Sequence, residues 1–301
     1  MEALHAIGVD LGGTKIEIIA MDERRDTLAR RRVPTPVGDY EATVETIGQL
    51  VDDVERDLKQ TGPVGIGTPG ATSPATGLIK NANSTVLIGK PLHADITARL
   101  HREIRMTNDA NCFVRSEAVD GAGAGARVVF GVILGTGVGG GIAVDTQPIL
   151  GVNAIAGEWG HNQLPWMRDD EAPGPQCYCG KIGCIETFVS GPALARQFRE
   201  RTGEHADART IAERAEQGDD SARTALERYE DQLSRALASV INIVDPETIV
   251  LGGGVSNVAR LYETVPHLLP RYVFSDRVET RIVRAAHGDS SGVRGAAMLW
   301  E

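Results

Sequence analysis

A short stretch at residues 157–186 gathers four side chains that commonly bind metal ions. They are one imidazole and three thiols, at His161, Cys177, Cys179 and Cys184. Three soft sulfurs and one ring nitrogen make a ligand set that closed tetrahedral zinc sites use. Because protein atoms would fill all four positions, no position is left for an activated water. The sequence therefore predicts a structural zinc ion, and residues 157–186 are called the Cys-His loop below.

Two glycines near the end of this loop must position its last ligand. Gly180 and Gly183 tolerate positive φ, so the chain can turn and bring Cys184 to the same ion as Cys177 and Cys179. The alternatives are a disulfide or free thiols without a ligand. The Cys-x-Cys spacing suits a metal better than a disulfide, and a chain without an export signal is expected in a reducing compartment.

A glycine turn between two strands occurs twice in the chain. Residues 6–11 and 16–20 read as strands around Gly12, Gly13, Thr14 and Lys15. The segment GVDLGGTKIEIIAMD at residues 8–22 aligns without a gap with GVILGTGVGGGIAVD at residues 131–145. A dinucleotide fingerprint or a P-loop would need a helix after the glycines.

Such hairpins can still hold phosphate, since glycines expose backbone N–H groups and Thr14 adds a hydroxyl donor. One copy alone is equally an ordinary glycine hairpin. The repeat favours two related domains that each present one hairpin to a nucleotide.

Two aspartates follow predicted strands. Asp10 ends the first strand, where it is suited to hold Mg²⁺ through water. Its counterpart in the second copy is Ile133, so the acid is present once. Asp109 follows a strand at residues 104–107, and carboxylates at such strand ends lie in the ligand crevice of open α/β sheets. Asp109 is therefore the candidate general base. The alternative is that Asp109 caps the next helix, a role that Asn108 or Asn111 could fill instead.

Hydrophobic periodicity predicts an α/β chain. Helices are expected at residues 40–59, 94–101, 191–201, 206–217, 221–244, 257–269 and 290–300. Further strands are expected at residues 28–33, 64–67, 248–251 and 281–284. Turns or loops carry Pro69 with Gly70, Asn83, and Gly252, Gly253 and Gly254. Plain turns are the alternative interpretation of each of these three segments.

The charge balance narrows the function classes. The chain has 31 Lys and Arg against 41 Asp and Glu, a formal charge of −10. Without basic blocks, nucleic-acid binding is not expected. The chain contains no run of eighteen apolar residues, so no membrane span is expected. The first residues, MEALHAIGVD, lack the features of an export signal, and a cytoplasmic location is therefore expected. Cys112, outside the predicted zinc set, is expected to be a small buried hydrophobe.

The Cys-His loop also carries a family resemblance. Glu158-x-Gly-His161 followed by Cys177-x-Cys-Gly-x-x-Gly-Cys184-x-Glu186 resembles the signature of the ROK family of sugar kinases. The resemblance extends from Asp10 to the tail at residues 287–297. It implies a two-domain actin-like ATPase/sugar kinase (ribonuclease H-like) fold with an interdomain active-site cleft. The expected domains are residues 1–118 plus 288–301, and a larger domain of residues 119–287 that carries the Cys-His loop.

The resemblance also assigns roles by position. It makes Asp109 the base that takes the proton of the attacking sugar hydroxyl. The positions expected to contact sugar are Pro69, Gly70, Asn83, Asn108, Asp109, Glu158, His161 and Glu186. The positions expected to contact ATP or its Mg²⁺ are Asp10, Gly12, Gly13, Thr14, Lys15, Thr136, Gly137, Gly252, Gly253 and Gly254. Among them, Thr136 and Gly137 are expected near the terminal phosphates, and the three later glycines at the adenosine.

Within the family, residues 81–85, 158–186 and 287–297 are most similar to bacterial fructokinases that also act on mannose. The expected reaction is therefore ATP-dependent phosphorylation of fructose at its 6-hydroxyl. N-acetylglucosamine kinase and glucokinase are the enzymatic alternatives, and a sugar-binding sensor is the non-enzymatic one. A zinc hydrolase would need an open metal position, which four protein ligands do not leave. A homodimer is a further expectation from the family.

Overall fold

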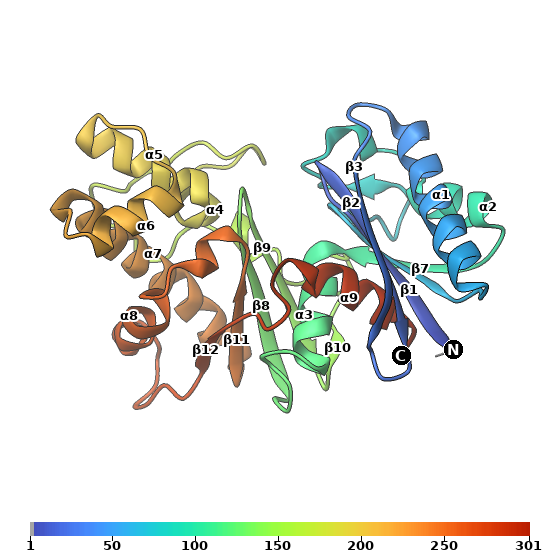
Figure 1. The fold of residues 1–301 in the computed structure, drawn as a ribbon. Coiled ribbons are helices and arrows are strands. Elements are labelled where there is room, and N and C mark those ends of the chain that lie inside the picture. The colour runs from blue at the N-terminus through green and yellow to red at the C-terminus, as the bar shows by residue number, and fades with distance from the viewer. Residues whose placement is uncertain (1–2) are drawn as a thin grey trace. The chain divides into compact units, whose positions relative to one another are not determined.

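The computed structural model describes residues 3–301, which form two compact units (Figure 1). Unit 1 contains the described residues up to Val119 together with Gln147–Ala156 and Ser290–Glu301, and unit 2 contains Asp120–Thr146 and Gly157–Asp289. The predicted division differs at residues 147–156, which it places in the larger domain, and at the boundary residues 119 and 288–289. The segment 147–156 is held in unit 1, where Lys80 Nζ donates a hydrogen bond to the Asn153 carbonyl (2.6 Å).

Unit 1 is built on a five-stranded sheet in the order β3-β2-β1-β4-β7. The strands are β1 (Leu4–Leu11), β2 (Lys15–Asp22), β3 (Thr27–Pro34), β4 (Val64–Thr68) and β7 (Ile104–Asn108). The pairs β1–β2 and β2–β3 are antiparallel, whereas β1–β4 and β4–β7 are parallel. The carboxyl ends of β1, β4 and β7 therefore meet at one edge, where Asp10 pairs with Gly67 and Thr68 with Asn108.

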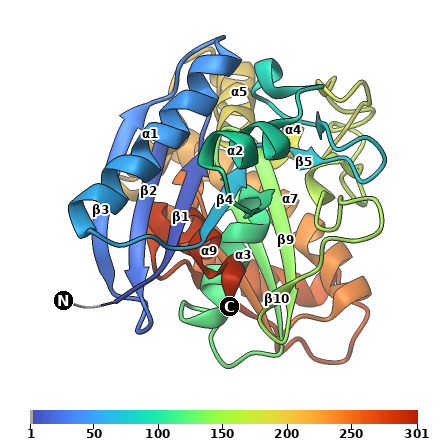
Figure 2. The ribbon, with the colours of Figure 1, turned by 90° about the vertical axis from the view of Figure 1, so that its right-hand side faces the viewer.

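Helices cover both faces of this sheet (Figures 1 and 2). α1 (Tyr40–Leu58) and α2 (Leu92–Leu100) lie on one face, and α3 (Asp109–Val119) and α9 (Ser291–Ala297) on the other. The alternation of β1 divides the core accordingly: Ile7 and Val9 pack in the cluster with α1 and α2, and Ala6 packs with α9. Gly8 faces α9, whose backbone passes so close that a Cβ would collide with the Val293 carbonyl.

Shorter elements complete unit 1. They are β5 (Ala71–Thr72), β6 (Ile79–Lys80), β10 (Gln147–Pro148), and the 3₁₀ turns η1 (Thr85–Leu87) and η6 (Met298–Trp300). A further turn, η5 (Gly288–Ser290), precedes α9. The predicted terminal helix at residues 290–300 is thus α9 followed by a 3₁₀ turn.

Unit 2 repeats the strand pattern of unit 1. Its strands are β8 (Val128–Leu134), β9 (Val138–Val144), β11 (Thr248–Gly252) and β12 (Arg281–Arg284). They lie in a five-stranded sheet in the order β10-β9-β8-β11-β12, with β10 at its edge. The pair β8–β9 is antiparallel, and β8–β11 and β11–β12 are parallel. The two hairpins keep the offset of the ungapped sequence repeat, since Leu11 and Lys15 match Leu134 and Val138.

The helices of unit 2 pack around α7 (Asp220–Val244). They are α4 (Glu186–Val189), α5 (Gly191–Thr202), α6 (Ala208–Glu216) and α8 (Leu261–Leu268), with the 3₁₀ turns η2 (Trp159–His161), η3 (Gly254–Asn257) and η4 (Leu269–Arg271). Buried Leu226, Tyr229, Leu233 and Leu237 recur at helical spacing along α7 and face the core.

One sequence expectation about the helices of unit 2 is adjusted. The helix predicted at residues 257–269 begins only at Leu261, because η3 extends to Asn257 and a turn follows at residues 258–260. Across residues 3–301, no helix combines the length and the apolar character needed to cross a bilayer.

Candidate functional site

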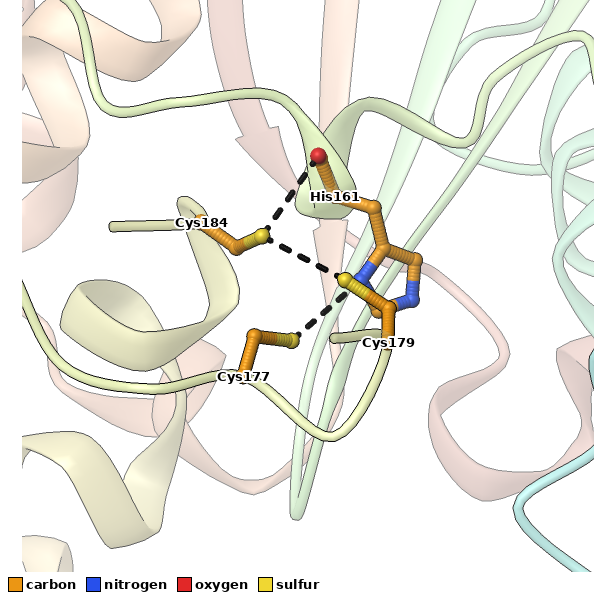
Figure 3. Close-up of side chains that lie close together, drawn as sticks. All are labelled: His161, Cys177, Cys179 and Cys184. Carbon is orange, nitrogen blue, oxygen red and sulfur yellow. Dashed lines mark hydrogen bonds between the residues drawn. The ribbon is translucent and has the colours of Figure 1, made fainter. Parts of the chain in front are cut away.

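The four predicted metal ligands converge in unit 2 (Figure 3). Their ligand atoms, from His161, Cys177, Cys179 and Cys184, all lie within 4.8 Å of one another. The Cys179 and Cys184 sulfurs are 3.6 Å apart, and His161 Nδ1 is 3.6 Å from the Cys177 sulfur. Ligands on a tetrahedral zinc ion at ~2.3 Å would lie about 3.7 Å apart. The donor set and its spacing therefore fit zinc, and the sulfurs are too far apart for a disulfide.

Tight turns of the backbone bring these ligands together. Gly180 and Gly183 adopt φ of 88° and 74°, the left-handed region that the sequence predicts for them. The Cys177 N–H donates to the Lys181 carbonyl (2.8 Å) and the Gly180 N–H to the Cys177 carbonyl (3.0 Å). Cys184 then returns beside Gln163 in an isolated antiparallel bridge.

His161 has its second ring nitrogen against a tyrosine. With Nδ1 facing the Cys177 sulfur, Nε2 lies 3.0 Å from Tyr178 Oη, and the two rings meet edge to face. Tyr178 is exposed, and burial of its hydroxyl end, with the charge of Glu186 next, raises its pKa to about 12. A hydroxyl group that approaches His161 Nε2 therefore meets Tyr178 as well. Glu158 stands just before the same 3₁₀ turn, η2.

Glu186 joins the Cys-His loop to the glycine hairpin of unit 2. Its Oε2 accepts a hydrogen bond from the Val138 N–H (2.9 Å) at the start of β9. A Cβ on Gly137 would lie only 2.6 Å from the same oxygen, so a side chain there would displace the Glu186 carboxylate. Predicted sugar and phosphate residues are thus in direct contact here. Thr136 lies at the exposed tip of the turn.

The glycine run after β11 borders a cavity of about 370 Å³. Gly253 has φ of 82° and would place a Cβ 2.5 Å from the Leu134 carbonyl, which keeps the turn tight against β8. Gly252 ends β11, and Gly254 lines the cavity with Val255, Asn257 and Val258. The opposite wall comes from α6, through Ala208, Arg209, Ala212, Glu213 and Glu216.

The hairpin of unit 1 presents the other predicted phosphate residues. The Gly12 N–H donates to the Lys15 carbonyl (2.9 Å), which closes the turn, and Gly13 and Thr14 are exposed at its tip. Thr35 braces the turn, since its hydroxyl donates to the Gly12 carbonyl (2.7 Å) and its N–H to the Thr14 carbonyl (3.0 Å).

Asp10 and Asp109 lie close enough in unit 1 to influence each other. Burial, followed by the charges of Asp109 and Glu17, raises the pKa of Asp10 to about 7. Its carboxylate lies beside Gly67 and Gly292, at 3.6 and 3.3 Å from where their Cβ atoms would be. Adjacent carboxylates that resist ionisation together make a favourable site for a divalent cation.

The alternative role of Asp109 as a helix cap is filled by its neighbour. The Asn111 N–H donates to Asn108 Oδ1 (2.9 Å), so the buried Asn108 satisfies the first turn of α3. Asp109 is exposed, and its Oδ1 accepts from the Ala110 N–H (2.8 Å). Below it, Cys112 is fully buried, as predicted.

The remaining predicted sugar residues of unit 1 also lie near one another. The turn after β4 holds Pro69 and Gly70, and Gly70 has φ of 73°. A Cβ there would lie 2.9 Å from the Ala82 N–H nitrogen, so this turn packs directly against the segment that carries the exposed Asn83.

Sequence reasoning missed three features of these regions. They are Tyr178 beside His161, the α6 wall of the cavity at Gly254, and the contact of Glu186 with the Val138 N–H. Only Tyr178 carried a signal in the sequence, because it stands between two predicted ligands. The other two depend on residues that are about 45 positions apart.

Comparison with known proteins identifies the family. The ROK family model matches residues 6–301. The N-acetyl-D-glucosamine kinase of Citrobacter koseri is 41% identical over 296 residues, which cover 97% of this chain and 98% of that protein. The protein of the same name from Salmonella typhimurium is 40% identical over the same shares.

Solved structures agree. The chain is similar to a ROK hexokinase from Thermus thermophilus, with a TM-score of 0.85, 29% identity and coverage of 97% and 96% of the two chains. It is also similar to a ROK glucokinase from Streptomyces griseus in complex with glucose and AMPPNP, with a TM-score of 0.79, 29% identity and 98% coverage of both chains. The expected likeness to fructokinases is not supported by the curated relatives. The chain belongs to the ROK family and is a sugar kinase with the two-domain actin-like fold.

Proposed function

We propose that this sugar kinase transfers the γ-phosphoryl group of ATP to the 6-hydroxyl of N-acetylglucosamine. One observation carries the proposal: the Citrobacter koseri N-acetyl-D-glucosamine kinase is 41% identical across 97% of this chain. This favours the alternative named from the sequence over the predicted fructose. Glucose is the second candidate, because the Streptomyces griseus glucokinase with glucose and AMPPNP covers 98% of the chain, at the lower identity of 29%.

Asp109 is the proposed general base. Its carboxylate is exposed. The side chain of Asn108 caps α3 by accepting from the Asn111 N–H, so Asp109 is not needed as the helix cap. It accepts the proton of the 6-hydroxyl as that oxygen attacks the γ-phosphorus in line. The proton moves to Asp109, the new O–P bond forms, and ADP leaves.

The nucleotide contacts are proposed for three glycine-rich turns. Backbone N–H groups at Gly13 and Thr14, with the Lys15 ammonium, meet phosphate oxygens, and so do Thr136 and Gly137. Gly12, whose own N–H closes the turn on the Lys15 carbonyl, lets the backbone approach the phosphate there. Adenosine lies against Gly252, Gly253 and Gly254, where the cavity beside α6 offers an apolar floor at Val255 and Val258. Mg²⁺, when bound near Asp10, neutralises charge on the β- and γ-phosphates.

The sugar contacts are proposed on the Cys-His loop and on the two turns of unit 1. Glu158, His161 and Glu186 accept or donate hydrogen bonds to sugar hydroxyls, and Asn108, Asn83, Pro69 and Gly70 add contacts. The zinc ion has a structural role, because four protein ligands satisfy it. Its binding energy holds a loop that has little regular secondary structure.

A coupled ADP-release assay with Mg-ATP tests this proposal across N-acetylglucosamine, glucose, mannose and fructose. We expect the largest kcat/KM with N-acetylglucosamine, and mass spectrometry of its 6-phosphate identifies the product. A larger kcat/KM with fructose or glucose would move the substrate assignment. Sugar binding without ADP release from any hexose would support the sensor alternative instead.

A further inference from the structure

A buried ion pair holds the middle of the Cys-His loop to α7. Both Oε atoms of Glu171 accept from the Arg235 guanidinium, from Nη1 and Nη2 at 2.8 Å each. Gln232 Nε2 (2.9 Å) and the Arg168 N–H (2.9 Å) also donate to this carboxylate, and Arg228 Nη2 lies 3.5 Å from its Oε1. The side chains of Glu171 and Arg235 are 0% and 1% exposed, so this bidentate pair is shielded from water.

Arg235 uses its remaining donors on the same loop and on its own helix. Nη1 also donates to the Trp166 carbonyl (2.9 Å), and Nε donates to Asp231 Oδ2 (3.0 Å). Asp231 in turn pairs with Arg168 of the loop (2.9 Å). Arg235 of α7 therefore holds residues 165–171 of the loop by bonds to a loop side chain and to the loop backbone. We call Glu171, Arg235 and Gln232 the loop clamp.

The loop clamp is continuous with the residues proposed to contact sugar. Pro165 follows His161 by four positions, and buried Leu164 donates its N–H to the Gly183 carbonyl (2.9 Å). The metal cluster holds this loop at residues 161 and 177–184, and the clamp holds it in between. The segment that carries Glu158 and His161 is thus held at His161 by the metal ligands and just beyond it, at residues 165–171, by the clamp.

The charge state of Glu171 shows that its pairing outweighs its burial. Burial alone would raise the pKa, but hydrogen bonds from Arg235, the Arg168 N–H and Gln232 lower it to about 2. The carboxylate stays ionised throughout the range in which enzymes work, so the clamp is closed at all such pH values.

From this geometry we propose that Glu171 and Arg235 are positioning residues for sugar binding. They act through the loop segment that carries Glu158 and His161 and do not touch the substrate. The inference rests on the proposed sugar-kinase site, and it adds a second anchor that is independent of the metal. Loss of the clamp leaves the metal cluster intact and lets the sugar-contacting segment shift.

A second buried pair on the same helix provides a matched control. Glu230, also 0% exposed, accepts from Arg260 Nε and Nη2, the latter at 3.0 Å. Arg260 lies just before α8, so this pair does not contact the Cys-His loop. Its carboxylate is equally buried and is likewise held by two nitrogens of one arginine, although Arg260 is 30% exposed where Arg235 is 1% exposed. Glu230→Gln is therefore the control for Glu171→Gln.

The experiment compares steady-state kinetics, zinc content and melting temperature of Glu171→Gln and Glu230→Gln. For Glu171→Gln, we expect KM for N-acetylglucosamine to rise about tenfold or more, with KM for ATP changed less than about twofold and zinc retained. For Glu230→Gln, we expect a lower melting temperature and an unchanged sugar KM. The double variant Glu171→Met with Arg235→Met should recover the melting temperature but not the sugar KM.

A readout without catalysis separates this inference from the proposed function. Trypsin should cut after Arg168 faster in Glu171→Gln than in wild type, and at the wild-type rate in Glu230→Gln. If sugar KM and cleavage both follow the melting temperature in the two variants alike, the positioning role is wrong. A wild-type protein inactive on every hexose would overturn the proposed function, and cleavage after Arg168 would still show whether the clamp holds the loop.

Discussion

The two glycine hairpins have the same strand arrangement and different side chains around it. In each hairpin the first strand (β1 or β8) pairs antiparallel with the second (β2 or β9). The first strand also pairs in parallel with the next strand of its sheet (β4 or β11). In unit 1, Asp10 of β1 pairs with Glu17 of β2. The repeat aligns these residues with Ile133 and Gly140 in unit 2, where the pairing is shifted by one residue and Ile133 pairs with Gly139. The fold is thus repeated, and the acidic chemistry is confined to one copy.

The position of Glu17 on β2, and of its counterpart on β9, shows what this difference allows. Glu17 is buried and bound by Arg30 (2.6 Å) and Arg32 (2.6 Å) from β3. Its counterpart in the ungapped repeat is Gly140, where a Cβ would lie 2.6 Å from Trp159 Cδ1 and 2.7 Å from the Gly157 carbonyl. Removal of a side chain on β9 makes room for the Cys-His loop. One hairpin is therefore suited to a cation and the other supports a binding loop.

The largest expected effect is on kcat and comes from the acidic residues of unit 1. Replacement of Asp109 with Asn removes the proposed base and keeps the shape, so kcat should fall about 10²–10⁴-fold. Sugar binding should be largely kept, which calorimetric titration of the variant checks. An unchanged kcat would remove Asp109 from its role.

A smaller effect is expected where the Cys-His loop rests on β9. Gly140→Ala should destabilise the protein by about 1–3 kcal/mol, because the nearest obstacles include backbone of residue 157 that cannot rotate away. Gly13→Ala, at the tip of the other hairpin, meets nothing within 4 Å and serves as the control. Chemical denaturation measures both, and equal losses would contradict this account of Gly140.

The smallest expected effect is a pH dependence that belongs to unit 1 alone. The pKa of Asp10 is raised from 3.8 to about 7, so the folded state binds the proton more tightly than the unfolded state does. The free energy of unfolding should therefore decrease as pH rises from about 4 to 7 and stay level above that range. Mg²⁺ competes with this proton, so its affinity should weaken below about pH 7.

Calorimetric titration of Mg²⁺ at several pH values, in the presence of ATP, checks this dependence. Asp10→Asn should bind Mg²⁺ weakly with no such slope. A wild-type slope that persists in Asp10→Asn would assign the titration to another group.

Local patterns made much of this predictable. The ungapped repeat gave both hairpins, because strand, turn and strand are set by neighbouring residues. Ligand type and glycine spacing likewise predicted the cluster at Cys177, Cys179 and Cys184. The contact of Glu186 with the Val138 N–H was not predictable, since it joins residues 48 positions apart through packing of the loop. For the same reason the sequence did not place residues 147–156 in unit 1.

We propose that the Cys-His loop serves sugar binding and Asp10 serves Mg-ATP binding. The most direct test is calorimetric titration of sugar and nucleotide against three proteins. They are the wild type, Cys179→Ser and Asp10→Asn, with zinc content measured for each. The account predicts that Cys179→Ser loses zinc and binds N-acetylglucosamine about tenfold or more weakly, while it keeps Mg-ATP binding. Asp10→Asn should weaken Mg-ATP binding and keep the sugar. Zinc retained in Cys179→Ser, or equal loss of both ligands in both variants, would contradict the account.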